Sequence, residues 1–365
     1  MQAAARYGLP CRVLVRRGRK PKGDIEAAAR AARYRLLLDA CREEGASHLL
    51  LAHHRDDQAE NFLLRLGRGS GLFGLAAMRR EIGLGQVTLF RPFLDLPRER
   101  LRQTVAAAGL EPVEDEMNED RRFARVRIRQ ALPLLAEEGI DGRNLAETAR
   151  RLADAAEAID HAAGRLIAET AECDAFATVR IDPEPFFTAP REVRLRALAR
   201  ILLAIGGDLY PPRFERLAGL AEAMAAAGKG QRLKRTLAGT IIERRAGRFL
   251  FYREAGREGL ERVPLAPGSD FIWDGRFAIR ADPALQSGLS VAALGEEGRR
   301  LAGPLPEGVP AGVIETLPAV WRGKRLRAVP ILGFVIGRPL PISMHAAIAE
   351  RMAQPPLFPG FFVSI

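Results

Sequence analysis

Cysteine and histidine are scarce in this chain, which restricts the disulfide and metal chemistry it can support. Its 365 residues include five histidines and only three cysteines, Cys11, Cys41 and Cys173. An odd number of widely spaced cysteines fits neither a disulfide framework nor a zinc or iron–sulfur site. We therefore expect the three thiols to be ordinary small core residues and predict no metal-ligating cluster.

Long apolar runs are also missing. No stretch of about 18 or more apolar residues occurs, and the first residues lack the basic, apolar and small-residue zones of a signal peptide. We therefore expect a soluble cytoplasmic protein that has no membrane partner. At 47% apolar composition the chain can bury a large core, and its length is enough for about two or three domains.

Positive charge, in contrast, is abundant. The net charge is +11 and the isoelectric point is about 10.3, almost entirely because of arginine. Such a balance favours a polyanionic partner such as RNA. Biased codon usage is the alternative explanation for a chain rich in arginine, alanine and glycine.

The densest group of chemically versatile side chains follows a short apolar run. Residues 47–52 are typical of a buried strand. Two imidazoles and three carboxylates come directly after it: His53, His54, Asp56, Asp57 and Glu60. In an open α/β sheet, ligands bind beyond the carboxyl ends of the strands, so this cluster is the best candidate site.

Other interpretations account for parts of this cluster. A helix beginning near Asp56 or Asp57 would give Asp57 and Glu60 the spacing of a capping box, worth about 1 kcal/mol without any chemistry. Residues three apart share a helix face, so the same carboxylates can instead hold a cation or a substrate ammonium. A metal-dependent hydrolase using His53, His54 and Asp57 is a further alternative, although no distant histidine cluster supports it.

Apolar periodicity, with glycine and proline as stop signals, predicts the remaining elements. We expect strands over 11–15, 87–94, 240–244 and 249–253, and helices over 24–44, 97–108, 121–135, 144–172, 192–205 and 212–227. Gly69–Gly74 matches a dinucleotide fingerprint only formally, because a helix is expected before it where the fingerprint needs a strand. Arg122, Arg125 and Arg129 share one helix face, which is either solvated or binds phosphate.

Five segments together resemble one family of bacterial enzymes. They are Ile25–Tyr34, His53–Glu60, Arg68–Leu75, Asp115–Asn118 and Arg125–Pro133. Their order and spacing over roughly the first 135 residues are similar to those of bacterial tRNA(Ile)-lysidine synthetase, which belongs to the N-type ATP pyrophosphatases with a PP-loop.

The resemblance implies an ATP-dependent ligase. In the family, ATP adenylates the C2 oxygen of the wobble cytidine of tRNA(Ile), and the ε-amino group of free L-lysine then displaces AMP, so that the anticodon reads isoleucine instead of methionine. Mg²⁺ accompanies the ATP. By the same resemblance His53, Asp57 and Glu60 line the site for lysine and the reacting base. Arg33 and Arg125 face the phosphates or the adenylated intermediate.

One motif of the family is missing. Its phosphate loop has the form S-G-G-x-D-S, and no such motif occurs in these 365 residues. We therefore expect an N-terminally truncated PP-loop domain with an incomplete Rossmann-like parallel sheet. Unpaired buried backbone groups cost about 1–3 kcal/mol each, so we expect this chain not to activate ATP unaided. A non-catalytic tRNA-binding remnant is the main alternative.

Shifts in composition predict three domains. Residues 1–135 form the truncated ATPase-like domain, 136–255 a helical domain that seats the tRNA, and 256–365 a small α+β domain with hairpins that contacts tRNA. The sequence leaves a homodimer as one option for assembly.

Candidate RNA-binding side chains lie in the first two domains. They are Arg122, Arg129, Lys229, Arg232 and Lys234. Trp273 and Trp321 either stack on unpaired bases or pack in the core, and the second is the commoner role of large aromatics.

Overall fold

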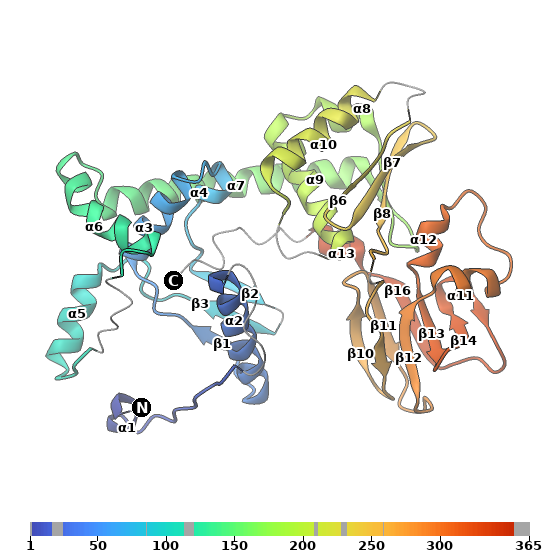
Figure 1. Ribbon diagram of the computed structural model, residues 1–365, viewed down its shortest axis with the longest axis horizontal. Coiled ribbons are helices and arrows are strands. Elements are labelled where there is room, and N and C mark those ends of the chain that lie inside the picture. The colour runs from blue at the N-terminus through green and yellow to red at the C-terminus, as the bar shows by residue number, and fades with distance from the viewer. Residues whose placement is uncertain are drawn as a thin grey trace. The chain divides into compact units, whose positions relative to one another are not determined.

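The structure is a computed structural model that describes residues 2–16, 25–84, 86–112, 120–207, 211–227, 232–257 and 259–353. The chain divides after Glu157 into two compact units. Both combine helices with small sheets, which agrees with a mixed α/β protein (Figure 1). The division into three domains, at 135/136 and 255/256, stays a prediction.

The first unit holds one three-stranded sheet among its described elements. These are α1 (Gln2–Arg6), α2 (Ile25–Glu43), β1 (His48–Leu50), α3 (Arg55–Leu66), α4 (Leu72–Leu75), β2 (Glu81–Leu84), β3 (Val87–Phe90), α5 (Arg98–Ala107), α6 (Ala124–Glu137) and the start of α7 (Gly142–Thr170). The sheet order is β1–β3–β2, with β1 parallel and β2 antiparallel to β3. The sheet predicted to be parallel is therefore mixed, because the hairpin partner β2 was not foreseen.

Most elements predicted for this unit form, but one strand does not. The strands around β1 and β3 and the helices α2, α5 and α6 are confirmed, and Gly45 ends α2 with a φ of +66°. The strand expected over 11–15 is wrong: no described strand pairs with this segment, and Val13 and Val15 are 67% and 68% exposed. An extended segment becomes a strand only when a neighbour accepts its backbone hydrogen bonds. The expectation that all three cysteines are core residues holds for Cys41, which is buried, but is wrong for Cys11 and Cys173, which are exposed.

The glycine-rich segment after α3 allows close packing of Gly74 against Ser70. Helix α3 precedes it, which agrees with rejecting a dinucleotide fingerprint. A Cβ at Gly74 would lie 2.6 Å from the Cβ of Ser70, so only glycine fits without a shift. The segment leads into α4, which packs against α3.

The second unit begins within α7 and contains three described antiparallel sheets. Its other helices are α8 (Pro183–Thr188), α9 (Arg191–Gly206), α10 (Phe214–Ala226), α11 (Gly295–Leu301), α12 (Ala311–Glu315), the 3₁₀ helix η2 (Pro330–Leu332) and α13 (Ile348–Ala353). The first sheet has the order β4 (Ala171–Cys173), β5 (Val179–Ile181), β8 (Arg248–Arg253), β7 (Thr240–Arg245) and β6 (Lys234–Leu237). The region predicted as helical therefore also carries a five-stranded sheet, of which β7 and β8 were expected.

The two remaining sheets follow β8 in the chain. One has the order β10 (Asp270–Trp273), β11 (Phe277–Ala281) and β16 (Ile342–Ala346). The other has the order β15 (Phe334–Val335), β14 (Arg325–Val329), β13 (Pro318–Arg322), β12 (Leu289–Ala293) and β9 (Val263–Leu265). Asp274 and Gly275, with φ of +48° and +65°, form the tight turn between β10 and β11.

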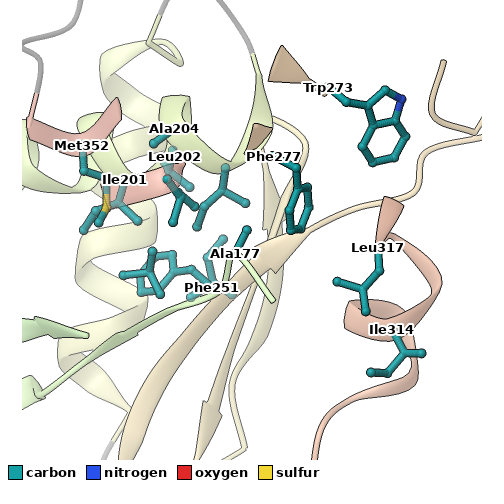
Figure 2. Close-up of a cluster of buried hydrophobic side chains, with 14 of the residues drawn as sticks. Ala177, Ile201, Leu202, Ala204, Phe251, Trp273, Phe277, Ile314, Leu317 and Met352 are labelled. Atoms are coloured by element: carbon teal, nitrogen blue, oxygen red, sulfur yellow. The ribbon is translucent and has the colours of Figure 1, made fainter. Parts of the chain in front are cut away.

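A large continuous apolar core dominates the second unit, beside a smaller cluster of Leu250, Tyr252 and Val313. It joins residues of α9, β8 and the C-terminal sheets (Figure 2). Trp273 and Trp321 are 1% and 6% exposed, which confirms that both are core residues. The indole Nε1 of Trp273 donates to the carbonyl of Glu261 at 2.9 Å. Base stacking by these two rings is thereby ruled out in this conformation.

The apolar clusters of the first unit are much smaller. One joins Ala59 and Phe62 of α3 to Leu145 and Ala149 of α7, and another consists of Met78 and Leu94. None of the described helices of the chain combines the length and apolar character that crossing a bilayer requires.

Candidate functional site

The two histidines after β1 lie between that strand and α3. His54 is the N-cap of α3: its Nδ1 accepts from the backbone N–H of Asp57 at 3.4 Å, and the Asp57 carboxylate accepts from the backbone N–H of His54 at 2.9 Å. The predicted capping box of Asp57 with Glu60 is therefore wrong by one turn. His54 has the extended backbone that an N-cap needs, while Glu60 is bound by arginines.

Asp56 has a structural role, because its carboxylate binds the start of helix α5. Its Oδ2 accepts from the backbone N–H of Arg98 at 2.7 Å, at the first residue of α5. A carboxylate at a helix start satisfies an otherwise unpaired N–H and interacts well with the helix dipole. Asp56 thus fixes α5 beside α3.

Two carboxylates of α3 meet two arginines of α6, and we name these four residues the carboxylate–arginine cluster. Asp57 and Glu60 are three apart, and Arg125 and Arg129 four apart, so each pair shares one helix face. Arg125 donates from Nε to Glu60 at 2.5 Å and from Nη2 to Asp57 at 2.9 Å. Arg129 donates to both oxygens of Glu60, at 2.7 and 3.2 Å.

Every carboxylate oxygen of this cluster already accepts a hydrogen bond. Both oxygens of Glu60 bind guanidinium groups, and those of Asp57 bind Arg125 and the His54 backbone. The Glu60 side chain is 2% exposed and that of Asp57 is 16% exposed. Glu60 raises the pKa of Arg129 above its ordinary value through their hydrogen bond. The cluster is thus a compensated ion network in which Asp57 is the more accessible acid.

His53 is buried beside this cluster. Burial, reinforced by the positive charge of Arg91, lowers the pKa of His53 to about 4. Among the described residues neither of its ring nitrogens has a hydrogen-bond partner. The imidazole is therefore neutral at pH 7 and retains one donor and one acceptor for a bound molecule.

Sequence reasoning missed Arg91, which is fully buried at the end of β3. Its Nη1 donates to the carbonyl of Arg79 at 2.8 Å. Burial lowers the pKa of Arg91, while a hydrogen bond with Tyr34 of α2 raises it. The only signal in the sequence was the position of Arg91 between a strand and Pro92.

Arg33 forms no ion pair with the carboxylate–arginine cluster among the described residues. It is exposed on α2, next to the buried Tyr34. The structure therefore brings Asp57, Glu60 and Arg125 together, with His53 adjacent, and leaves Arg33 at the surface.

The candidate RNA-binding residues have mixed surroundings. Arg122 is 88% exposed and pairs with Asp120, whereas Arg129 belongs to the carboxylate–arginine cluster. Lys234 on β6 lies 3.8 Å from Glu243, and Arg232 is exposed. Lys229 lies outside the described residues, as does the turn Asp115–Asn118.

The described residues offer no fitted site for a divalent cation. No group of three His, Cys, Asp or Glu side chains in the described ranges could hold a metal ion. Both oxygens of Glu60 and one of Asp57 accept from guanidinium groups, and a cation at ligand distance from these oxygens would be repelled by that positive charge. The hydrolase alternative based on His53, His54 and Asp57 gains no support.

Comparison with known proteins gives consistent matches. Residues 1–135 match the family model of a PP-loop domain. The tRNA(Ile)-lysidine synthase of Ruegeria pomeroyi is 38% identical over 335 residues, which cover 92% of this chain and 77% of that protein. The enzyme of the same name from Rhodopseudomonas palustris is 42% identical over 71% of this chain and 77% of its own length. The enzyme of the same name from Methylobacterium nodulans is 44% identical over 67% of this chain and 73% of its own length.

Proposed function

This chain belongs to the tRNA(Ile)-lysidine synthase family, and from that membership we propose that it takes part in the ATP-dependent ligation of L-lysine to tRNA(Ile). The proposed reaction forms a bond between the lysine ε-nitrogen and C2 of the wobble cytidine. ATP first adenylates the C2 oxygen and releases pyrophosphate. The amine then displaces AMP and loses a proton.

The carboxylate–arginine cluster is the observation that carries this proposal. Asp57 is the better candidate for a substrate ammonium, because it is partly exposed and shares only one of its oxygens with Arg125. An ammonium that binds Asp57 competes with Arg125 for that oxygen. The released guanidinium group would then be free to approach a phosphate.

Glu60 and His53 have supporting roles in this scheme. Glu60 is buried and holds Arg125 and Arg129 in place, so we assign it the positioning of both guanidinium groups. His53 has a pKa of about 4 and is a weak base at pH 7. It therefore orients the amine or the base by hydrogen bonding, and proton removal falls to a carboxylate or to water.

ATP is the proposed co-substrate, and Mg²⁺ would travel with its phosphates, since no described carboxylate set holds the ion. Arg125 is the proposed contact to the phosphates, and Arg33 on α2 is a second candidate. We further propose a cytoplasmic enzyme, as expected for one that acts on tRNA.

A lysine-incorporation assay tests the function. The 365-residue chain is incubated with ATP, Mg²⁺, labelled L-lysine and a tRNA(Ile) transcript carrying a CAU anticodon, with the initiator tRNA(Met) as control. Label that appears only in tRNA(Ile) supports the proposal. Specific binding of tRNA(Ile) without incorporation or ATP–pyrophosphate exchange would support the tRNA-binding remnant instead. Absence of both binding and incorporation would refute the assignment.

A further inference from the structure

An exposed aromatic ring among arginines marks the start of α9 and α10. Phe214, the first residue of α10, is 54% exposed. Every other Phe, Tyr or Trp in the described ranges of the second unit is buried or half-buried. Unlike the other aromatic side chains described in this unit, the Phe214 ring is accessible to a bound molecule.

The surroundings of Phe214 are cationic. The guanidinium of Arg191, the first residue of α9, lies 5.3 Å from the centre of the Phe214 ring. Arg213, the N-cap of α10, and Arg216 within α10 are exposed on either side of Phe214, with the exposed Glu215 between Phe214 and Arg216. The helices α9 and α10 pack against each other (Figure 1), so both first turns contribute. We name Phe214, Arg191, Arg213 and Arg216 the Phe214 surface.

From this surface we propose that the second unit binds an unpaired RNA base, stacked on Phe214, with the neighbouring arginines on the flanking phosphates. This inference rests on the proposed function for the choice of RNA as partner. Stacking on an aromatic ring beside a positively charged groove is the usual means of holding single-stranded nucleic acid, because every base has a π face.

The composition of the surface favours RNA over a protein partner. The other large exposed hydrophobics described in the second unit are Ile272 on β10, Leu301 on α11, Val335 on β15 and Ile336 after it, so none belongs to α9 or α10. The core of a protein interface needs contiguous apolar area. Glu192 lies only 3.5 Å from Arg191, but this pair is exposed and weak, so a phosphate can displace it.

Helix geometry adds to the positive potential. Neither α9 nor α10 has a side-chain cap, and their N-cap residues are Pro190 and Arg213. Arginines at a helix start repel the positive end of the helix dipole, which a bound anion would relieve. Glu192 and Glu215 in the same first turns offset part of this repulsion, and the three arginines still leave a net positive charge that favours a bound phosphate.

Binding measurements with matched variants test the proposal. The variants are Phe214→Ala, Phe214→Trp and Arg191→Gln. Leu301→Ala and Arg280→Gln are controls, because Leu301 is 53% exposed and Arg280 is 75% exposed on elements away from the surface. The probes are the tRNA(Ile) transcript, a short single-stranded RNA and a fully paired RNA duplex of the same length. Thermal melting checks that each variant folds.

We expect Phe214→Ala to weaken single-strand binding by about 5- to 150-fold, the range for loss of one stacked base. Phe214→Trp should keep the affinity and show quenched tryptophan fluorescence on RNA binding. Arg191→Gln should lower the slope of log affinity against log salt by about 0.7. Duplex binding and both controls should change less than about twofold, within the scatter of a surface substitution.

The outcomes separate this inference from the proposed function. Unchanged single-strand affinity of Phe214→Ala, or an equal loss on the duplex, overturns the stacking role even if lysine is incorporated normally. A Phe214-dependent single-strand affinity in a chain that never forms lysidine leaves the stacking role intact and refutes the function. A change of oligomeric state without change in RNA affinity would assign the surface to a second copy of the chain and also overturn the proposal.

Discussion

The two units differ in how some of their buried charges are held. In the second unit two buried arginines are anchored to backbone carbonyls, Arg276 to that of Thr316 and Arg200 to that of Met352, while Arg196 forms an ion pair with Asp160. In the first unit, Arg125 and Arg129 bind the side chains of Glu60 and Asp57. Anchoring to backbone carbonyls suits rigidity, because a ligand cannot replace them. Asp57 is a more accessible side-chain partner than Asp160, with 16% of its side chain exposed against 6%, so the pair it forms with Arg125 suits exchange for a ligand.

The two units also differ in apolar packing, which is more extensive in the second unit. The core of the second unit is continuous across its sheets, while that of the first unit consists of small separate clusters. Local stability follows buried apolar contact, so we expect the first unit to open more readily. Four predictions test this contrast, beginning with the largest expected effect.

Glu60→Gln should strongly destabilise the first unit. The change leaves Arg125 and Arg129, whose side chains are 11% and 31% exposed, without their shared buried carboxylate, and loss of one partner in a buried ion pair costs up to about 3–5 kcal/mol. Hydrogen exchange read by mass spectrometry should show faster exchange in α3 and α6 but not in α9.

Glu147→Gln is the matched control for that substitution. Glu147 on α7 also pairs with two arginines, Arg150 and Arg151, which lower its pKa to about 2, but it is exposed. We expect little change in exchange. Equal changes in hydrogen exchange for the two substitutions would contradict the claim that burial makes Glu60 more important to stability than Glu147.

Leu202→Ala should weaken the second unit. Leu202 on α9 is fully buried in the continuous core, and removing its side chain leaves a cavity that costs about 2–5 kcal/mol. Exchange should accelerate in α9 and β8 while α3 is unaffected. Leu301→Ala, at an exposed position, should change stability by less than about 0.5 kcal/mol. Acceleration of α3 to the same extent would mean that the units unfold together.

Acid should destabilise the first unit selectively. The pKa of His53 is about 4 in the folded protein and 6.5 in the unfolded chain. Between these values the unfolded chain binds more protons, so stability falls as pH decreases from about 6.5 to about 4, by up to about 3 kcal/mol. Urea unfolding over this pH range should show the slope, and His53→Leu should remove it. If the stability of His53→Leu depends on pH as strongly as that of the unmodified protein, other titrating groups cause the effect.

Arg122→Gln should have the smallest effect. Arg122 is 88% exposed, so we expect no change in hydrogen exchange. If it contacts a phosphate, the slope of log tRNA affinity against log salt should decrease by about 0.9. Arg232→Gln provides the comparison in the second unit. An unchanged slope in both variants would remove these arginines from the RNA contacts.

Local sequence signals predicted much of the secondary structure. The helices α9 and α10 and the strands β7 and β8 form within a few residues of the expected ranges, since apolar periodicity and glycine or proline stops act locally. The strands β2, β4, β5 and β6 were missed because each is short and depends on a partner strand. The expected strand over 11–15 failed for the related reason that no described strand pairs with it.

The site was predicted in part. Spacing placed Asp57 and Glu60 on one helix face and Arg125 and Arg129 on another, and the structure joins the two faces. Spacing alone did not identify His54 as the N-cap, because histidine is a rare cap. It also could not show that Arg91 is buried beside His53.

By itself, the sequence determined which side chains share a helix face and where most helices end, because both depend on residues a few positions apart. It also determined the family through the order of its motifs. Only the tertiary structure decided that Glu60 is shared by two arginines, that His53 is buried and neutral, and that Phe214 stays exposed. Burial and partner choice depend on residues distant in the chain, which local periodicity does not encode.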